Sequence, residues 1–301
     1  MSWKDVFVTN PCKVSYSNNN VLVQTSDKIH YLNLDDLQSL IVDTPEAVLT
    51  SRALVEMAKK NVSVILCDTN YLPASASISC LENSVSNLKI KHQINWNKKK
   101  IVDLWTKIVH QKIVNQINTL KNLKIDSLDL KKHLDRLELG DATNQEGVVA
   151  SLYFRKIQGL NFKRRDKSFS VNAALNYGYT VILNRITTEI ASHGYLTQLG
   201  IHHKSVNNNL NLSCDFIEIW RFIIDDYVFT SDLGELDTLA KARIIDRLNH
   251  QILYNGSKQI VANAIKIFVN DCLKYLSGEL KDIKFEVSEI EEPNNENASD
   301  V

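Results

Sequence analysis

Hydrophobic and polar positions alternate in short runs over the first eighty residues. The runs DVFVT, CKVSYS, VLVQT and KIHYLNL are rich in β-branched and aromatic residues, and turns containing Asn or Ser-Asp separate them. LQSLIVD and VSVILCD continue the pattern on either side of residues 50–60, where Ala53, Leu54 and Met57 share one side of a helix. Such runs between turn residues are typical of strands. The pattern therefore predicts a small sheet region with one covering helix.

The period of the pattern changes after Pro73. From about Leu81 to Leu276, apolar residues recur at helical spacing almost throughout. The predicted helices cover residues 87–115, 127–136, 144–158, 171–192, 211–227, 235–249 and 258–277. The predicted fold class is therefore α+β: a β-rich N-terminal domain over residues 1–80, followed by a larger all-α domain over residues 81–285. Residues 286–301 are polar and acidic, and they are predicted to form a disordered tail.

Composition narrows the class of protein. Hydrophobic residues make up 44% of the chain and charged residues 23%, as in an ordinary globular protein, and no apolar run is long enough to span a membrane. The N-terminus lacks an apolar signal core, so we expect a cytoplasmic protein. The five cysteines are scattered without a CxxC pair, which supports neither a disulfide framework nor a zinc knuckle.

The net charge of zero conceals an uneven distribution. Residues 286–301 hold six acidic residues and no basic one, which leaves 35 basic against 29 acidic residues in the rest of the chain. The predicted folded part is therefore mildly basic, and it permits a nucleic-acid partner without demanding one.

The segment LGIHHKSVNNNLNLSCDFIEIWR combines polar, chemically capable groups with a strongly apolar helix. Asp215 and Glu218 are three residues apart, which places their carboxylates on one face of the predicted helix, and His203 lies in the loop before it. A carboxylate beside Trp220 is costly unless a cation pairs with it. Either a divalent metal ion or Arg221 could be that cation, and one imidazole with two carboxylates makes an incomplete ligand set.

A third carboxylate is needed to complete such a set, and Glu146 in DATNQEGVVASLYF is the best candidate. An alternative interpretation needs no metal. Thr143-x-x-Glu146 has the form of a capping box, in which Glu146 would bond back to the start of its own helix.

A basic stretch follows Glu146 closely. RKIQGLNFKRRDK, residues 155–167, holds six basic residues and one acidic residue, and aromatic residues flank or interrupt it. It predicts a surface that contacts DNA phosphates, although a solvated loop would have the same composition. The basic residues expected to contact DNA are Arg155, Lys163, Arg164, Arg165, Lys204 and Arg221. The motifs GxxxxGK[ST], GxGxxG, GxSxG and HExxH are absent, which leaves nucleotide hydrolysis, dinucleotide redox chemistry and serine hydrolysis without support.

These segments together resemble one known family. NQEGVVASLYF, FKRRDKSFSVNAALNYGYTVI and LGIHH…CDFIEIWR follow one another in the order and approximate spacing of the CRISPR-associated integrase (Cas1) family of the adaptation machinery. The opening MSWKDVFVTNPCKVSYSNNNVLV is similar to the type II branch of that family, and the resemblance spans roughly residues 1–280. One departure is visible: the family often has "MEPFRP" after the aspartate, where this chain has IEIWRFI. The departure keeps the carboxylates, but the family pattern then does not predict where the helix ends.

The resemblance implies roles for individual residues. Glu146, His203 and Glu218 resemble the family's metal-binding residues, and Asp215 completes the expected catalytic set. The spacing from Gly200 selects His203 rather than His202 as the ligand. Neighbouring side chains of an extended backbone point to opposite faces, so we expect His202 to face away from the carboxylates.

The resemblance also implies a biology, which is antiviral defence by spacer acquisition. The chain would be a metal-dependent DNA strand transferase and endonuclease, using Mg²⁺ or Mn²⁺, that inserts short foreign DNA into a CRISPR array by attack of a DNA 3′-hydroxyl on a phosphodiester. Expected partners are double-stranded DNA (prespacer and repeat–leader), a second copy of the chain bound through the β-rich domain, a Cas2 dimer, the type II effector nuclease and, in some subtypes, Csn2. The competing hypotheses are a purely hydrolytic nuclease and a non-catalytic helical scaffold that binds DNA or protein.

Overall fold

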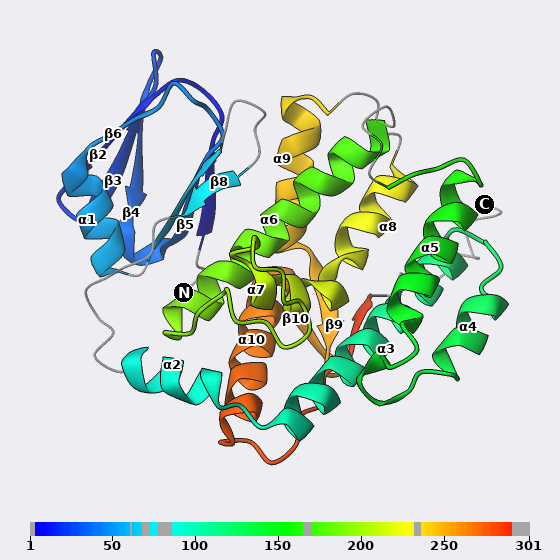
Figure 1. The fold of residues 1–301 in the computed structure, drawn as a ribbon. Coiled ribbons are helices and arrows are strands. Elements are labelled where there is room, and N and C mark those ends of the chain that lie inside the picture. The colour runs from blue at the N-terminus through cyan, green and yellow to red at the C-terminus, as the bar shows by residue number, and fades with distance from the viewer. Residues whose placement is uncertain are drawn as a thin grey trace, which may run out of the picture.

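The chain folds into a β-rich N-terminal region and a mostly helical region that follows it (Figure 1). The structure is a computed structural model, and it describes residues 4–60, 62–67, 73–76, 86–164, 166, 170–231 and 236–290. The α+β prediction is confirmed. The predicted boundary near residue 80 falls in a segment that is not among the described residues. No described helix is both long enough and apolar enough to cross a membrane.

Two sheets build the N-terminal region. The first has the strand order β1-β5-β7-β8, with β1, β5 and β7 parallel and β8 antiparallel to β7. The second has the order β4-β3-β2-β6 and consists of antiparallel hairpin pairs plus a short parallel pairing of β2 with β6. The strands are β1 Lys4–Val8, β2 Lys13–Ser17, β3 Asn20–Gln24, β4 Ile29–Asn33, β5 Leu37–Val42, β6 Val48–Leu49, β7 Ser63–Cys67 and β8 Pro73–Ala76.

The covering helix of this region is α1, Ser51–Lys59. The side chain of Thr50 caps it by accepting a hydrogen bond from the backbone N–H of Ala53 (3.3 Å). Ala53 and Met57 are fully buried against the sheet core, as the sequence pattern predicts. The alternating runs all form strands here, whereas β6 and β8 have no counterpart in the sequence interpretation.

The helical region is organised around the long helices α3, α6 and α10 (Figure 1). Its helices are α2 Ser86–Ile94, α3 Lys98–Asn122, α4 Leu128–Leu134, α5 Gln145–Gln158, α6 Ser170–Ser192, α7 Asn211–Phe216, α8 Phe222–Thr230, α9 Thr238–Asp246 and α10 Val261–Ser277. The first predicted helix is divided in two, because the side chain of Asn97 accepts from the N–H of Lys99 (2.8 Å) and starts α3 afresh. The predicted helix 211–227 instead passes from α7 through the 3-10 turn η3, Ile217–Trp220, into α8.

A small three-stranded sheet corrects two predictions. Residues 251–260 form a hairpin of β9 (Gln251–Tyr254) and β10 (Ser257–Ile260), so the last long helix begins at Val261 and not at residue 258. The turn uses Asn255 and Gly256, both with positive φ, as hairpins of this length require.

The third strand of this sheet is β11, Val287–Glu289, which pairs with β9. The predicted disordered tail from residue 286 therefore begins with an ordered strand. Val287 is buried, its carbonyl accepts a hydrogen bond from the side chain of Gln111 (3.0 Å), and the carboxylate of Glu289 contacts Arg247 and His250. Residues 291–301 are not among the residues described.

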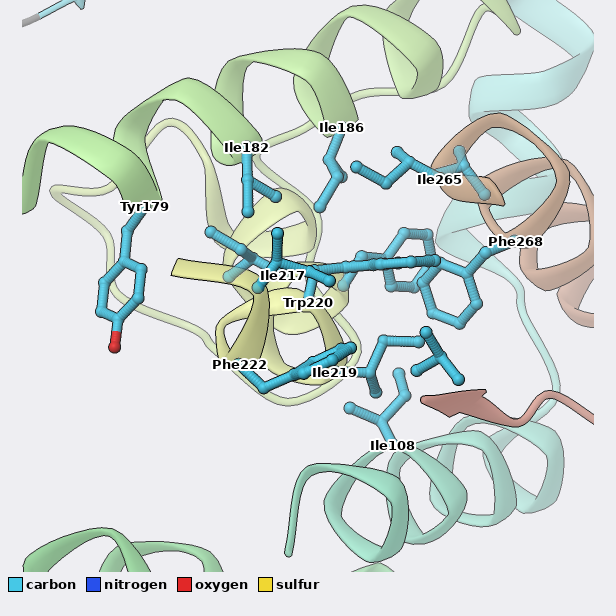
Figure 2. Close-up of a cluster of buried hydrophobic side chains, with 14 of the residues drawn as sticks. Ile108, Tyr179, Ile182, Ile186, Ile217, Ile219, Trp220, Phe222, Ile265 and Phe268 are labelled. Atoms are coloured by element: carbon cyan, nitrogen blue, oxygen red, sulfur yellow. The ribbon is translucent and has the colours of Figure 1, made fainter. Parts of the chain in front are cut away.

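A cluster of buried side chains positions the segment that carries Glu218. Figure 2 shows Trp220 of η3 at its centre, surrounded by Ile182 and Ile186 from α6 and by Ile265 and Phe268 from α10. The ring centroids of Trp220 and Phe268 are 5.7 Å apart in an edge-to-face arrangement. Because η3 is short and Trp220 is fully buried, this packing fixes the direction in which the neighbouring Glu218 leaves the backbone.

Candidate active site

Glu218 is a buried carboxylate held between two cations. The guanidinium of Arg221 donates to it from Nε (3.0 Å) and from Nη2 (2.8 Å), and the ammonium of Lys112 on α3 lies 2.5 Å from Oε2. Burial alone would raise the pKa of Glu218, but Arg221 and Lys112 outweigh it and hold that pKa well below its usual range. The ion pair of Glu218 with Arg221, one of the two possibilities left open by the sequence, is therefore formed.

The same lysine pairs with Glu146. The Lys112 ammonium contacts a carboxylate oxygen of Glu146, so two acidic residues from separate elements converge on one cationic atom. Burial would lower the pKa of Lys112, yet the charges of Glu218 and Glu146 more than compensate and raise it above its ordinary value. The ammonium is thus the resident cation of this site.

The capping-box interpretation of Glu146 is wrong. Helix α5 begins at Gln145, and the carboxylate of Asp141 caps it by accepting from the backbone N–H groups of Gln145 (2.6 Å) and Glu146 (3.0 Å). Thr143 accepts instead from the side-chain amide of Gln145 (2.9 Å). Because Asp141 performs the capping, the carboxylate of Glu146 is left to face Lys112.

Asp215 organises the histidine loop. Its buried carboxylate accepts from the backbone N–H groups of Ile201 (2.6 Å), His202 (3.1 Å) and His203 (2.9 Å), and its Oδ1 lies 2.6 Å from Nδ1 of His203. This last hydrogen bond is the main cause of a raised pKa at His203, which burial opposes. With Nδ1 occupied, Nε2 is the ring nitrogen of His203 that remains for another partner.

Gly200 is required for this close approach. A Cβ atom at that position would lie 2.4 Å from the carbonyl oxygen of His203 and 2.7 Å from Oδ2 of Asp215. Neither contact could relax without breaking the hydrogen bonds that hold the loop. A side chain at position 200 is therefore sterically excluded, which explains the glycine.

The ring of His202 lies against α3. It stacks on the buried indole of Trp105, with ring centroids 4.1 Å apart and planes 7° from parallel, while the ring of His203 meets the same indole edge-on at 6.1 Å. Helix α3 therefore supplies both Lys112 and the surface on which the histidine loop rests.

The carboxylates of Glu146 and Glu218 and the imidazole of His203 are suitable ligands for a divalent ion. Their donor atoms do not surround one common position. In the part of the chain that the structure describes, no three side chains of His, Cys, Asp or Glu stand close enough to hold a metal as they lie. Glu146 and Glu218 nevertheless already converge on a cation, and both act on the pKa of the nearby His203. Two carboxylates and an imidazole would suit Mg²⁺ or Mn²⁺ if the ammonium gave up its place.

Behind Arg221 lies a buried tyrosine–aspartate cluster that the sequence interpretation missed. Tyr153 donates its hydroxyl hydrogen to Asp225 (3.1 Å), Tyr179 donates to the other oxygen, and the guanidinium of Arg221 is 4.6 Å from the Tyr179 ring centroid. The guanidinium of Arg164 lies 5.1 Å from the same ring. The signal available in the sequence was the acidic pair Asp225-Asp226 within an otherwise apolar helix.

Replacing Asp225 by Asn is expected to change how stability depends on pH. Burial raises the pKa of Asp225 from its ordinary value of 3.8 to about 6. Between these two pH values the carboxyl group is protonated in the folded protein and ionised in the unfolded chain. The stability that this group contributes is fully present below pH 3.8 and is lost as the pH rises through about 6. The wild type should lose about 2 kcal/mol of unfolding free energy relative to Asp225→Asn between pH 4 and pH 7. Urea denaturation of both proteins across that range measures the difference; a pH-independent difference would contradict it.

The basic residues predicted to contact DNA divide into two groups. Arg155, Lys163 and Lys204 are exposed, so their charges are available to a phosphate backbone. Arg164 and Arg221 are half-buried and engaged with the Tyr179 ring, and Arg164 also donates to Asn176 (2.8 Å). Arg165 lies outside the residues that the structure describes.

Comparisons with known proteins agree on one family. The family model described as "CRISPR associated protein Cas1" matches residues 6–265. The chain is 30% identical over 259 residues to "CRISPR-associated endonuclease Cas1" of Neisseria meningitidis serogroup C, covering 84% of this chain and 85% of that protein.

Solved structures share the fold. "Casposase bound to integration product" superposes with a TM-score of 0.76 at 18% identity, covering 94% of this chain and 92% of that one. A chain of a "Cas6-RT-Cas1--Cas2 complex" gives 0.72 at 17% identity, covering 92% of this chain and 35% of that one. At these identities the superpositions establish a common fold.

Proposed function

The chain belongs to the CRISPR-associated Cas1 family, and from that premise we propose that it is a divalent-metal-dependent integrase that inserts short foreign DNA into a CRISPR array. The observation that carries the proposal is the convergence of Glu146 and Glu218 on one cation beside His203. A helical scaffold would not need two carboxylates from separate elements aimed at a single buried charge, because burying such charges costs stability.

The residues that would hold Mg²⁺ or Mn²⁺ are Glu146, His203 and Glu218. When bound, such an ion stabilises negative charge on the oxygens of a reacting phosphodiester. Asp215 contributes by fixing the ring of His203 through Nδ1, and Arg221 contributes by holding both oxygens of Glu218 in place. The attacking group would be the 3′-hydroxyl of the incoming DNA, which forms a new phosphodiester as a 3′-oxygen of the array leaves.

The proposed partners follow from the family and from the surface. We propose that double-stranded DNA, prespacer and repeat–leader, meets the exposed basic residues Arg155, Lys163 and Lys204. The similar chains were solved with an integration product and in a Cas1–Cas2 complex, which supports a Cas2 dimer as a partner here. We further propose a homodimer formed through the β-rich region and a place in the type II branch, with Csn2 and the effector nuclease as additional partners.

An integration assay tests the proposal. A supercoiled plasmid carrying an array, a labelled short duplex and a purified Cas2 partner are incubated with the protein and Mn²⁺. We expect covalent joining of the label to the plasmid, and no joining in EDTA. Label-free nicking that depends on Mn²⁺ would favour the hydrolytic nuclease, an activity consistent with the endonuclease name of the Neisseria relative. DNA binding without any joining or nicking would favour the scaffold.

A further inference from the structure

Lys112 is an unusual residue to find where it lies. It is 5% exposed, on the buried side of α3, and its ammonium is 2.5 Å from Glu218 and in contact with Glu146. Burying a lysine is costly unless opposite charges surround it, so the position is maintained by the two carboxylates themselves. These are the same two carboxylates that the proposed function assigns to the metal.

The charges of the cluster balance without any metal. Glu146 and Glu218 carry two negative charges, while Lys112 and Arg221 carry two positive charges. Arg221 binds both oxygens of Glu218, and Lys112 pairs with Glu218 and with Glu146, the two carboxylates that would hold the metal. A doubly charged ion added beside the ammonium would meet strong repulsion at a separation of a few ångströms.

We propose that Lys112 is a built-in competitor for the divalent cation, an inference that rests on the proposed metal-dependent function. Its ammonium occupies the position between Glu146 and Glu218 in the metal-free protein, and the ion binds in exchange for it. Lys112 thereby keeps the buried carboxylates neutralised at rest and lowers the affinity of the free protein for divalent ions.

Exchange of the Lys112 ammonium for the ion can start at Glu146. The side chain of Glu146 is 27% exposed, against 4% for Glu218, so water can replace the lysine there at less cost. The four-carbon stem of Lys112 lets the ammonium move while its helix stays fixed. DNA phosphates arriving at the site would supply the negative charge that the ion and the displaced ammonium together require. DNA and the ion should therefore bind cooperatively, each raising the affinity for the other by the same factor.

Direct metal binding tests the inference without relying on activity. Mn²⁺ affinity is measured by isothermal titration calorimetry on the DNA-free wild type and on Lys112→Met. We expect the variant to bind Mn²⁺ more tightly, with a Kd lower on the order of tenfold, because a like charge has been removed from beside the ion. The metal-free variant should also melt at a lower temperature than the wild type, and Mn²⁺ should raise its melting temperature by more.

Lys107→Met is the matched control. Lys107 lies on the same helix and makes ion pairs with Asp103 (3.0 Å) and Asp282 (2.9 Å) away from the site, so its loss removes the same charge and leaves Mn²⁺ affinity unchanged. Lys112→Gln provides a second neutral variant that can still donate hydrogen bonds to a carboxylate. If Lys112→Met does not fold, the same tighter binding is expected of Lys112→Gln.

The outcomes separate this inference from the function on which it rests. If the wild type binds Mn²⁺ but both neutral variants bind it equally or more weakly, Lys112 is a structural partner of the carboxylates and the competitor inference is overturned. If the wild type binds no Mn²⁺ with or without a short duplex, and neither neutral variant does, the proposed metal-dependent function itself fails.

Discussion

Glu218→Ala and His203→Ala are each expected to abolish strand transfer while the protein stays folded. Each change removes one of the three groups proposed to hold the ion, and the ion is expected to supply several kcal/mol of transition-state stabilisation. The initial rate of joining a labelled duplex to an array plasmid should therefore fall by about a thousandfold or more. The measurement is made at saturating Mn²⁺, with circular dichroism to confirm the fold.

Two further variants make this test specific. His202→Ala removes a ring that stacks on Trp105 and should keep the Mn²⁺ requirement, perturbing only the support of the loop. Glu146→Ala should also abolish joining without the loss of a helix cap, because Asp141 caps α5. A silent His203→Ala beside a dead His202→Ala would refute the choice of ligand. Normal joining by Glu146→Ala would remove that residue from the metal set.

Trp220→Ala is expected to lower the free energy of unfolding by about 3–5 kcal/mol, the range found when a large aromatic side chain is removed from a core. The indole is fully buried between residues of α6 and α10, so the surrounding helices cannot close the space completely (Figure 2). Urea denaturation followed by circular dichroism measures the loss. Joining activity should fall as well, because Glu218 shares the same short 3-10 turn.

Trp220→Phe is the matched control for that cavity. The indole Nε1 of Trp220 is buried and has no hydrogen-bond partner among the described residues. Replacing Trp220 by Phe therefore removes packing contacts but no hydrogen bond. Its cost should be well below that of alanine. Equal costs for the two variants would show that the ring volume that phenylalanine retains does not stabilise this core.

The sequence predicted the sheet region well because its strands have strong local signals. Alternating β-branched runs between Asn- and Asp-containing turns leave little choice of register, and Thr50 precedes α1 as a regular N-cap. The parallel pairing of β1, β5 and β7 had no such local signal, since it depends on contacts between segments far apart in the chain. The Asn255-Gly256 pair did signal a hairpin, but a helical interpretation of the flanking residues obscured it.

The candidate site was half predictable for a related reason. The spacing of Asp215 and Glu218 predicted that their carboxylates share one helix face. The segment IEIWRFI, which differs from the family pattern, runs from η3 directly into α8 with helical backbone angles. Lys112 was missed, although Trp105, Ile108, Val109 and Lys112 have the i, i+3, i+4, i+7 spacing of one helix face. That spacing places a lysine on the apolar side. Which carboxylates meet it there depends on tertiary packing, which one sequence does not reveal.

The hydrogen bond from Gln111 to the carbonyl of Val287 spans 176 residues, so it can form only after both segments have been synthesised. Among the residues that the structure describes, the hydrophobic core of the N-terminal sheets lies within residues 6–64, so that region can fold while the remainder is still being translated. Strand β11 is synthesised long after α3, which it contacts through Gln111, and it follows β9, with which it pairs. Translation that stopped before Val287 would release a finished β region joined to a helical region with an unpaired strand edge, a substrate for chaperones and proteases.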